Sequence, residues 1–269
     1  MKLLIVGAGS MGRWVADTLS AEVAFADIDS EAAEAAATAH GGRVVIANTD
    51  ERFDAVCLAV PISAVEAAAA QFAPNADSAV FDVTGSMAGP LAALREHAPD
   101  RERASYHPLF APENAPGNVA AVIDDGGPTL DRLASAFAAA GNNVFETTAD
   151  EHDEAMQTVQ AGAHAAVLAY ALAADDVRDE FATPVSAALD DVVDTVTGGT
   201  PRVYAEIQET FEGASSVAEA ATRVADADGE AFERLYREAG RHRVADLAET
   251  LDGAEENSAE RASNGGDER

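Results

Sequence analysis

The feature that most constrains the fold is a glycine-rich turn directly after a short apolar run near the N-terminus. Residues 3–6, LLIV, are typical of a buried parallel strand. Residues 7–12 then read GAGSMG, a G-x-G-x-x-G pattern. In such a pattern the first glycine permits a tight turn and the third lets a helix pack closely on the strand. The pattern therefore predicts a strand, a tight turn and a helix.

Further strand-like runs alternate with alanine-rich helical stretches. The expected strands are 23–26, 44–46, 55–60, 79–83, 119–123 and 143–145, and the expected helices are 11–20, 30–39, 63–72, 88–97 and 129–140. Alternating β and α units imply a parallel sheet covered by helices on both faces. After residue 147 the strand signals stop. We expect an α/β fold, with a Rossmann-type parallel sheet followed by an all-α C-terminal part.

The glycine turn also suits a dinucleotide. The second glycine, Gly9, lets the backbone approach a pyrophosphate, and the start of the helix offers free N–H groups. Asp27 ends the second expected strand, where a carboxylate binds the ribose hydroxyls of NAD and repels the 2′-phosphate of NADP. Since no arginine follows Asp27, we expect NAD as the cofactor. The expected cofactor-binding residues are Gly7, Gly9, Ser10, Met11, Gly12 and Asp27.

The change from alternating units to helices suggests a domain boundary. Thr148 and Glu151 fit a capping box at the start of the helical part. We expect an NAD-binding Rossmann domain at 1–148 and a helical domain at 149–252 for substrate and dimerisation. The stretch 253–269, rich in Glu, Ser, Asn and Gly, has the composition of a disordered tail.

The chain is strongly acidic. It has 48 Asp and Glu against 17 Lys and Arg, a net charge of −31, and Lys2 is its only lysine. At molar salt the Debye length falls to about 3 Å, which screens the self-repulsion of such a surface. We therefore expect a protein of an extreme halophile. Nucleic acid is not an expected partner, because phosphate binding needs clustered basic residues.

Other classes are excluded by what the sequence lacks. Cys57 is the single cysteine, so no disulfide framework and no cysteine-based metal site is expected, and we assign no metal. The N-terminal apolar run is too short for a signal peptide, and no run of about 18 apolar residues marks a membrane span. We expect a cytoplasmic protein without a membrane partner.

One histidine stands among apolar residues in YHPLFAP, residues 106–112. A residue before proline is restricted to extended conformations, so a stiff backbone orients His107. This loop, residues 59–61 and residues 82–86 all follow expected strands. Ligands of doubly wound sheets bind outside the carboxyl ends of the strands. His107 is therefore a candidate functional residue rather than only a half-buried loop histidine.

Taken together, these motifs resemble the prephenate dehydrogenases of tyrosine biosynthesis, over about residues 1–210. The resemblance is carried by the glycine turn, by 82–86 (DVTGS, similar to Asp-x-x-Ser-x-Lys), by 107–110 (HPLF, similar to His-Pro-Met-Phe), and by Glu151-His152-Asp153 continuing through Met156, Gln160 and His164. It implies NAD-dependent oxidative decarboxylation of prephenate to 4-hydroxyphenylpyruvate, carbon dioxide and NADH.

The resemblance also implies roles for single residues. His107 would accept the proton of the C4 hydroxyl, Ser86 would orient His107 or the substrate, and His164 would line the pocket. An ordinary histidine pKa near 6.5 suits general base catalysis at neutral pH. His152 and Asp153 match the motif but are not expected to be catalytic, because Asp153 can simply favour the positive end of its helix.

The sequence departs from the family pattern at two places, and these leave alternatives open for the site residues and the function. Gly85, rather than Ser86, could be the aligned position for the serine. Residues 186–195, where the family places an arginine for a substrate carboxylate, contain no arginine and three aspartates, so Arg202, Arg241 or Arg243 would have to supply it. The alternatives are an arogenate dehydrogenase, another oxidoreductase of this plan acting on an imine or a β-hydroxy acid, or a non-catalytic NAD-sensing protein.

The helical part also predicts an assembly. Residues 161–174 are apolar on more than one face, which suggests burial against a second copy. We expect a homodimer formed through the helical domain.

Overall fold

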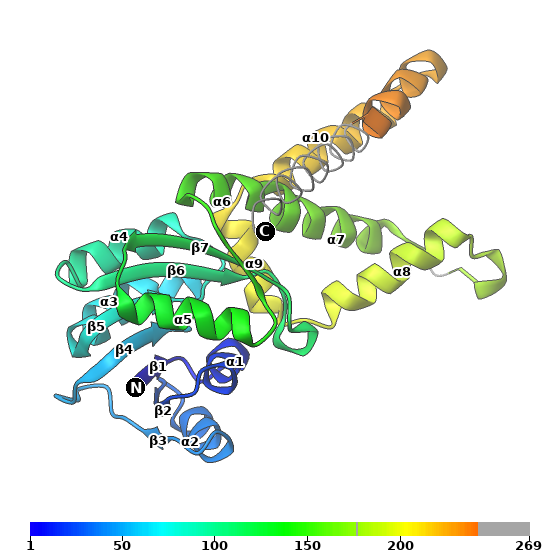
Figure 1. Ribbon diagram of the computed structural model, residues 1–269. Helices are drawn as coiled ribbons and strands as arrows, with labels where there is room; N and C mark the ends of the chain where they lie inside the picture. Colours follow the sequence, from blue (N-terminus) through cyan, green and yellow to red (C-terminus); the bar gives the residue numbers. More distant parts are fainter. Residues whose placement is uncertain (176, 242–269) are drawn as a thin grey trace, which may run out of the picture. The chain divides into compact units, whose positions relative to one another are not determined.

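The computed structural model describes residues 1–175 and 177–241. Residues 1–214 form one compact unit, and the described residues from 215 onward belong to a second. The first unit contains an eight-stranded sheet of order β3-β2-β1-β4-β5-β6-β7-β8 (Figure 1). The strands are β1 (Lys2–Val6), β2 (Glu22–Ala26), β3 (Arg43–Val44), β4 (Phe53–Leu58), β5 (Ala76–Asp82), β6 (Glu102–Pro108), β7 (Asn118–Asp125) and β8 (Asn143–Glu146).

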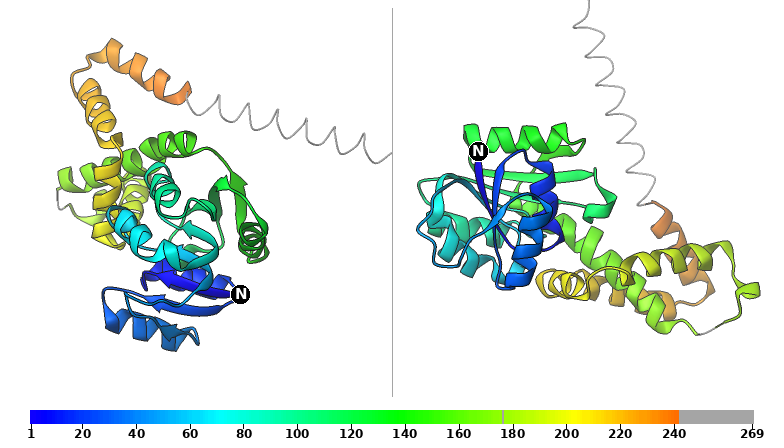
Figure 2. Two further views of the ribbon diagram at one scale, coloured as in Figure 1. Left: turned by 90° about the vertical axis from the view of Figure 1, so that its left-hand side faces the viewer. Right: turned by 90° about the horizontal axis from the view of Figure 1, so that it is seen from below.

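Helices cover both faces of the sheet, as Figures 1 and 2 show. One core cluster packs α1 (Ser10–Thr18), α2 (Ser30–Ala39) and α5 (Pro128–Ala139) on one face, and another packs α3 (Val65–Phe72) and α4 (Ala88–His97) on the other. Short connecting helices are η1 (Ile62–Ala64), η2 (Ala73–Asn75) and η3 (Pro112–Asn114). Burial on both faces explains why the parallel strands are continuous apolar runs. The predicted Rossmann-type sheet followed by helices is confirmed.

One strand differs from the sequence prediction. Residues 106–112 were expected to be a loop, yet 106–108 form the end of β6. The strand lacks an apolar start because Arg103 is buried in an ion pair with Asp124, 2.8 Å away. Strand β6 continues the parallel sheet beside β5, whereas β7 runs antiparallel to β6 and pairs Ala120 with His107. The sheet is therefore mostly parallel.

The chain turns helical after β8. The helices are α6 (Ala149–Met156), the π-helix η4 (Gln157–Gly162), α7 (Ala163–Ala173), η5 (Asp179–Phe181), α8 (Pro184–Thr197), α9 (Pro201–Thr210) and α10 (Gly213–Ala225), with further helix at 229–241. Thr148 caps α6 by accepting the Glu151 N–H at 3.2 Å. The Glu151 carboxylate instead accepts the Thr147 hydroxyl at 2.6 Å, so only half of the predicted capping box forms.

The proposed boundary at residue 148 stays a prediction, since α6 to α9 belong to the same compact unit as the sheet. The expected tail at 253–269, and Arg243, lie outside the described residues. Among the helices that the structure describes, none is long and apolar enough to cross a membrane.

Candidate active site

The glycine turn has the geometry that its spacing predicts. Gly7 has a φ of +105°, and a Cβ there would overlap the Ala59 carbonyl. A Cβ on Gly12 would overlap the Gly7 carbonyl, so this glycine allows α1 to pack against the turn. Gly9 differs, because a Cβ there would meet no atom within 4 Å. The first turn of α1 is therefore open at Gly9, where a pyrophosphate could approach its N–H groups.

The acidic residue expected for the ribose lies beside this turn. Asp27 accepts the Ala8 N–H at 2.6 Å and the Asp29 N–H at 2.9 Å. Ser10, the first residue of α1, is exposed, whereas Met11 is half-buried against the core. The predicted cofactor-binding residues are thus gathered at one edge of the sheet, and their shape and chemistry fit a dinucleotide.

His107 lies at the carboxyl end of β6, on the same edge of the sheet as the glycine turn. Its side chain is buried, and its Nδ1 lies 2.8 Å from Nε2 of His152. The other ring nitrogen, Nε2, is 3.3 Å from the amide nitrogen of Gln160. A Cβ built on Gly85 would lie 3.7 Å from the same Nε2. Gly85 therefore lies directly beside Nε2 of His107 and places no side chain against it.

Burial changes the acid–base chemistry of His107. Desolvation, followed by the neighbouring His152, lowers the pKa of His107 to about 3, although Asp153 opposes the shift. The ordinary histidine pKa near 6.5 that was expected for His107 therefore does not apply in this environment. His107 is consequently a neutral hydrogen-bond acceptor throughout the neutral pH range.

A carboxylate and a second histidine lie behind His107. Asp153 is 2.8 Å from Nδ1 of His152, and it also accepts the N–H groups of Met87 at 3.0 Å and Ala88 at 3.1 Å. Burial would raise the pKa of Asp153, but these hydrogen bonds hold it below its usual range. Asp153 was expected to interact with the positive N-terminal end of its own helix, α6. Its carboxylate instead binds the N-terminal end of α4.

Of the two remaining predicted residues, Ser86 lies beside Asp153, whereas His164 contacts Tyr204. The Ser86 hydroxyl is 3.5 Å from the Asp153 carboxylate. His164 packs its ring on Tyr204 with centroids 4.6 Å apart, and its buried Nδ1 has no hydrogen-bond partner among the described residues. Desolvation lowers the pKa of His164. Within the described chain, no hydrogen bond joins Ser86 or His164 to His107.

Sequence reasoning missed the connection of Gln160, His152 and Asp153 to His107. Their only signal was the run 151–160 that matched the family motif. Gln160 lies in the π-helix η4, and single π turns are frequent at functional sites.

One of the three arginines considered for a carboxylate belongs to this region. Arg202 contacts Glu206 at 3.3 Å. The Glu206 carboxylate in turn accepts the Ile62 N–H at 2.9 Å and the Ser63 hydroxyl at 3.0 Å. The Ile62 side chain lies beside Gly85, so Arg202 is linked to the His107 surroundings through two residues.

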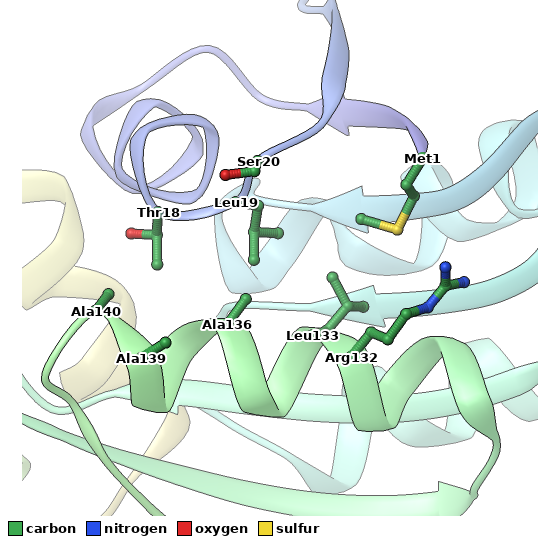
Figure 3. A pocket seen from close by; sticks show the side chains of 9 residues that line it. All are labelled: Met1, Thr18, Leu19, Ser20, Arg132, Leu133, Ala136, Ala139 and Ala140. Atoms are coloured by element: carbon green, nitrogen blue, oxygen red, sulfur yellow. The ribbon is translucent and has the colours of Figure 1, made fainter.

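A cavity of about 470 Å³ lies elsewhere, between α1 and α5 (Figure 3). Met1, which lines it, precedes β1, so the cavity lies at the amino end of that strand. The glycine turn follows the carboxyl end of β1. This cavity is therefore not the candidate active site.

The sheet, the open glycine turn and the neutral buried histidine at one edge define a Rossmann-type oxidoreductase. No family model matches the chain. A curated relative, the 4-amino-4-deoxyprephenate dehydrogenase of Streptomyces pristinaespiralis, is 34% identical and is aligned over 86% of this chain and 84% of that protein. The chain belongs to the prephenate dehydrogenase family.

Solved structures of other proteins have similar folds. Prephenate dehydrogenase from A. aeolicus, in complex with hydroxyphenyl propionate and NAD⁺, has a TM-score of 0.65 at 17% identity over 97% of this chain and 98% of that one. Synechocystis arogenate dehydrogenase has a TM-score of 0.61 at 17% identity over 91% and 99%.

Proposed function

We propose that the protein uses NAD as its cofactor. The support is the open backbone at Gly9, the close packing at Gly7 and Gly12, and the carboxylate of Asp27 next to the turn. The prephenate dehydrogenase from A. aeolicus, which has a similar fold, has a structure in complex with NAD⁺. When bound, NAD supplies the hydride acceptor, and the protein residues bind it and orient it towards the substrate.

We propose that the reaction is the oxidative decarboxylation of prephenate. The hydride on C4 leaves for NAD⁺, the bond from C1 to its carboxylate breaks, and the ring becomes aromatic. The products are 4-hydroxyphenylpyruvate, carbon dioxide and NADH. The observation that carries this proposal is His107, a neutral acceptor whose Nε2 lies beside Gly85, a position without a side chain. That nitrogen accepts the C4 hydroxyl proton as the hydride leaves.

The other residues of the site bind the substrate or orient the groups that do. Ser86 acts through Asp153, which its hydroxyl approaches, rather than through His107. His164 lines the substrate pocket from the helical part. Arg202 binds a substrate carboxylate, with Glu206 holding its guanidinium. A guanidinium is the residue type best suited to carboxylate recognition.

A second candidate substrate is 4-amino-4-deoxyprephenate, on which the curated relative is named to act. One feature of the site favours it. The buried Oε1 of Gln160 has no hydrogen-bond partner among the described residues. Together with His107 Nε2 it offers two acceptors, and a C4 amine provides more N–H donors than a hydroxyl.

The experiment that tests the function is NAD reduction by the purified protein in multi-molar KCl. Prephenate, its 4-amino analogue and arogenate are offered in parallel, with NADP as the control for the cofactor. Turnover of prephenate with NAD supports the first proposal, and preference for the amine supports the second. Reduction of neither cofactor with any of the three substrates would refute both.

A further inference from the structure

A series of three hydrogen-bonded side chains ends at Nδ1 of His107. Asp153, His152 and His107 are joined by contacts of 2.8 Å each, and both histidines are almost completely buried. A base that only accepts a proton at Nε2 does not require this arrangement. Its function can be worked out from donors and acceptors, because every contact needs one of each.

The proton positions follow from the carboxylate. Asp153 is ionised and can only accept, so a singly protonated His152 ring has its hydrogen on Nδ1. Nε2 of His152 then has a lone pair and accepts from Nδ1–H of His107. Neutral His107 consequently has its own lone pair on Nε2. The amide nitrogen of Gln160 lies 3.3 Å from this nitrogen and can donate to it in that tautomer.

The anchor of this chain of hydrogen bonds is fixed by the fold. The Asp153 carboxylate accepts two backbone N–H groups at the start of α4, those of Met87 and Ala88. A negative charge at a helix N-terminus is stabilised there. The carboxylate therefore keeps both its charge and its position, and it cannot rotate away from His152 without losing these bonds.

We propose that His152 and Asp153 are positioning residues that hold His107 in the Nδ1–H tautomer, so that its Nε2 lone pair faces the substrate. The proposed function is needed only for the kinetic part of this inference. When Nε2 accepts the proton from the C4 hydroxyl, His107 keeps its bond to His152, and the negative charge of Asp153 stabilises the imidazolium. Decarboxylation then returns an electron pair to the ring, the C4 oxygen takes the proton back, and His107 regains its starting tautomer.

Two substitutions of His152 separate an acceptor role from a packing role. His152→Gln provides an oxygen that can accept from His107, whereas His152→Phe keeps an aromatic ring but has no acceptor. We expect kcat to fall about 10²- to 10⁴-fold in His152→Phe. His152→Gln should retain most of the activity, and the KM values for substrate and NAD should be unchanged in both. A purely structural role predicts the opposite order of the two variants.

Substitution of Asp153, whose carboxylate holds His152 in place, gives a third kinetic test. Asp153→Asn should lower kcat, because its NH₂ group must face either His152 or the N–H groups of α4. Glu154→Gln, on the same helix and exposed, removes a charge without touching these bonds and should leave kcat unchanged.

The decisive measurement does not depend on turnover. ¹⁵N NMR of the histidine-labelled protein at neutral pH reports which ring nitrogen has the hydrogen, and the His107 signals are assigned by their loss in His107→Asn. We expect Nδ1–H for His107 in the native protein and a shift towards Nε2–H in His152→Phe. Nε2–H in the native protein, or an unchanged tautomer in His152→Phe, would overturn the inference. Failure of every offered substrate would refute the proposed function while leaving this result valid.

Discussion

At the scale of single residues, the environment of His107 determines what it can do. A histidine in water is half-protonated near pH 6.5, but burial and a second histidine shift the pKa of His107 to about 3. The free base is therefore present at every pH at which such an enzyme would be assayed. The acid limb of a rate profile through neutral pH then belongs to another group, and the base acts through its orientation.

The first prediction concerns His107 itself. In His107→Asn, kcat should fall about 10²- to 10⁴-fold because the proton acceptor is lost. The Kd for NAD, measured by titration of the purified variant, should not change, since the glycine turn is untouched. Circular dichroism of the variant in the same KCl buffer is the control for folding. Native turnover in this variant would mean that His107 is only structural.

A second residue, Asp82, should make stability depend on pH. It is fully buried, and desolvation raises its pKa to about 6, although hydrogen bonds from Thr84 oppose the shift. A raised pKa favours the protonated form in the folded state. The contribution of Asp82 to folding stability is therefore fully present below the ordinary carboxyl pKa near 3.9, and it is lost as the pH rises through 6. The loss is about 3 kcal/mol for a shift of this size.

Asp82→Asn mimics the protonated carboxyl group and should remove this dependence. We expect the variant to gain stability over the native protein as the pH rises from 5 to 7.5, measured by urea unfolding in KCl. Asp100→Asn, an exposed carboxylate after α4, is the matched control. A constant difference between the Asp82 variant and the native protein across this pH range would contradict the prediction.

At the scale of elements, two glycines of one turn serve different purposes. Gly12→Ala places a Cβ on the Gly7 carbonyl, and overpacking of this kind costs about 1–3 kcal/mol of folding stability. Gly9→Ala meets no protein atom, so it should cost about 1 kcal/mol or less as a helix N-cap change. It should nevertheless weaken NAD binding at least tenfold, because the methyl group occupies the approach of the pyrophosphate. Equal NAD affinity in native protein and Gly9→Ala would place the pyrophosphate elsewhere.

The same scale shows what the sequence could predict. Strands buried on both faces are apolar runs, so most of the sheet was predictable, as was the switch to helices near residue 148. Strand β6 was not, because Arg103 finds its partner Asp124 only after β7 folds beside it. The glycine turn and His107 have local signals. The run 151–160 matched the family motif, but the link from His107 to Asp153 could not be predicted from it, since it requires α6 to pack on the start of α4.

At the scale of the whole molecule, the net charge of −31 sets the conditions for folding. Because the acidic residues repel one another unless salt screens them, Tm should rise steeply with KCl between low and molar concentrations. Thermal unfolding over a KCl series measures this, and sucrose at matched water activity is the control for a general solute effect. A Tm independent of KCl would remove the argument that the chain is adapted to a salty environment.

The last prediction concerns assembly through the helical part. Helix α7 has no charged residue and no buried residue, although it packs beside α8. Its Leu172 is 88% exposed, and Val185 at the start of α8 is 70% exposed. Such uncovered apolar surface is typical of an interface, and a twofold dimer would cover the same helices on both copies. We therefore expect a homodimer by light scattering in multi-molar KCl.

Leu172→Glu combined with Val185→Glu should give the monomeric mass, whereas Ile46→Glu, an equally exposed apolar position after β3, should leave the dimer intact. A monomeric native protein would contradict the prediction.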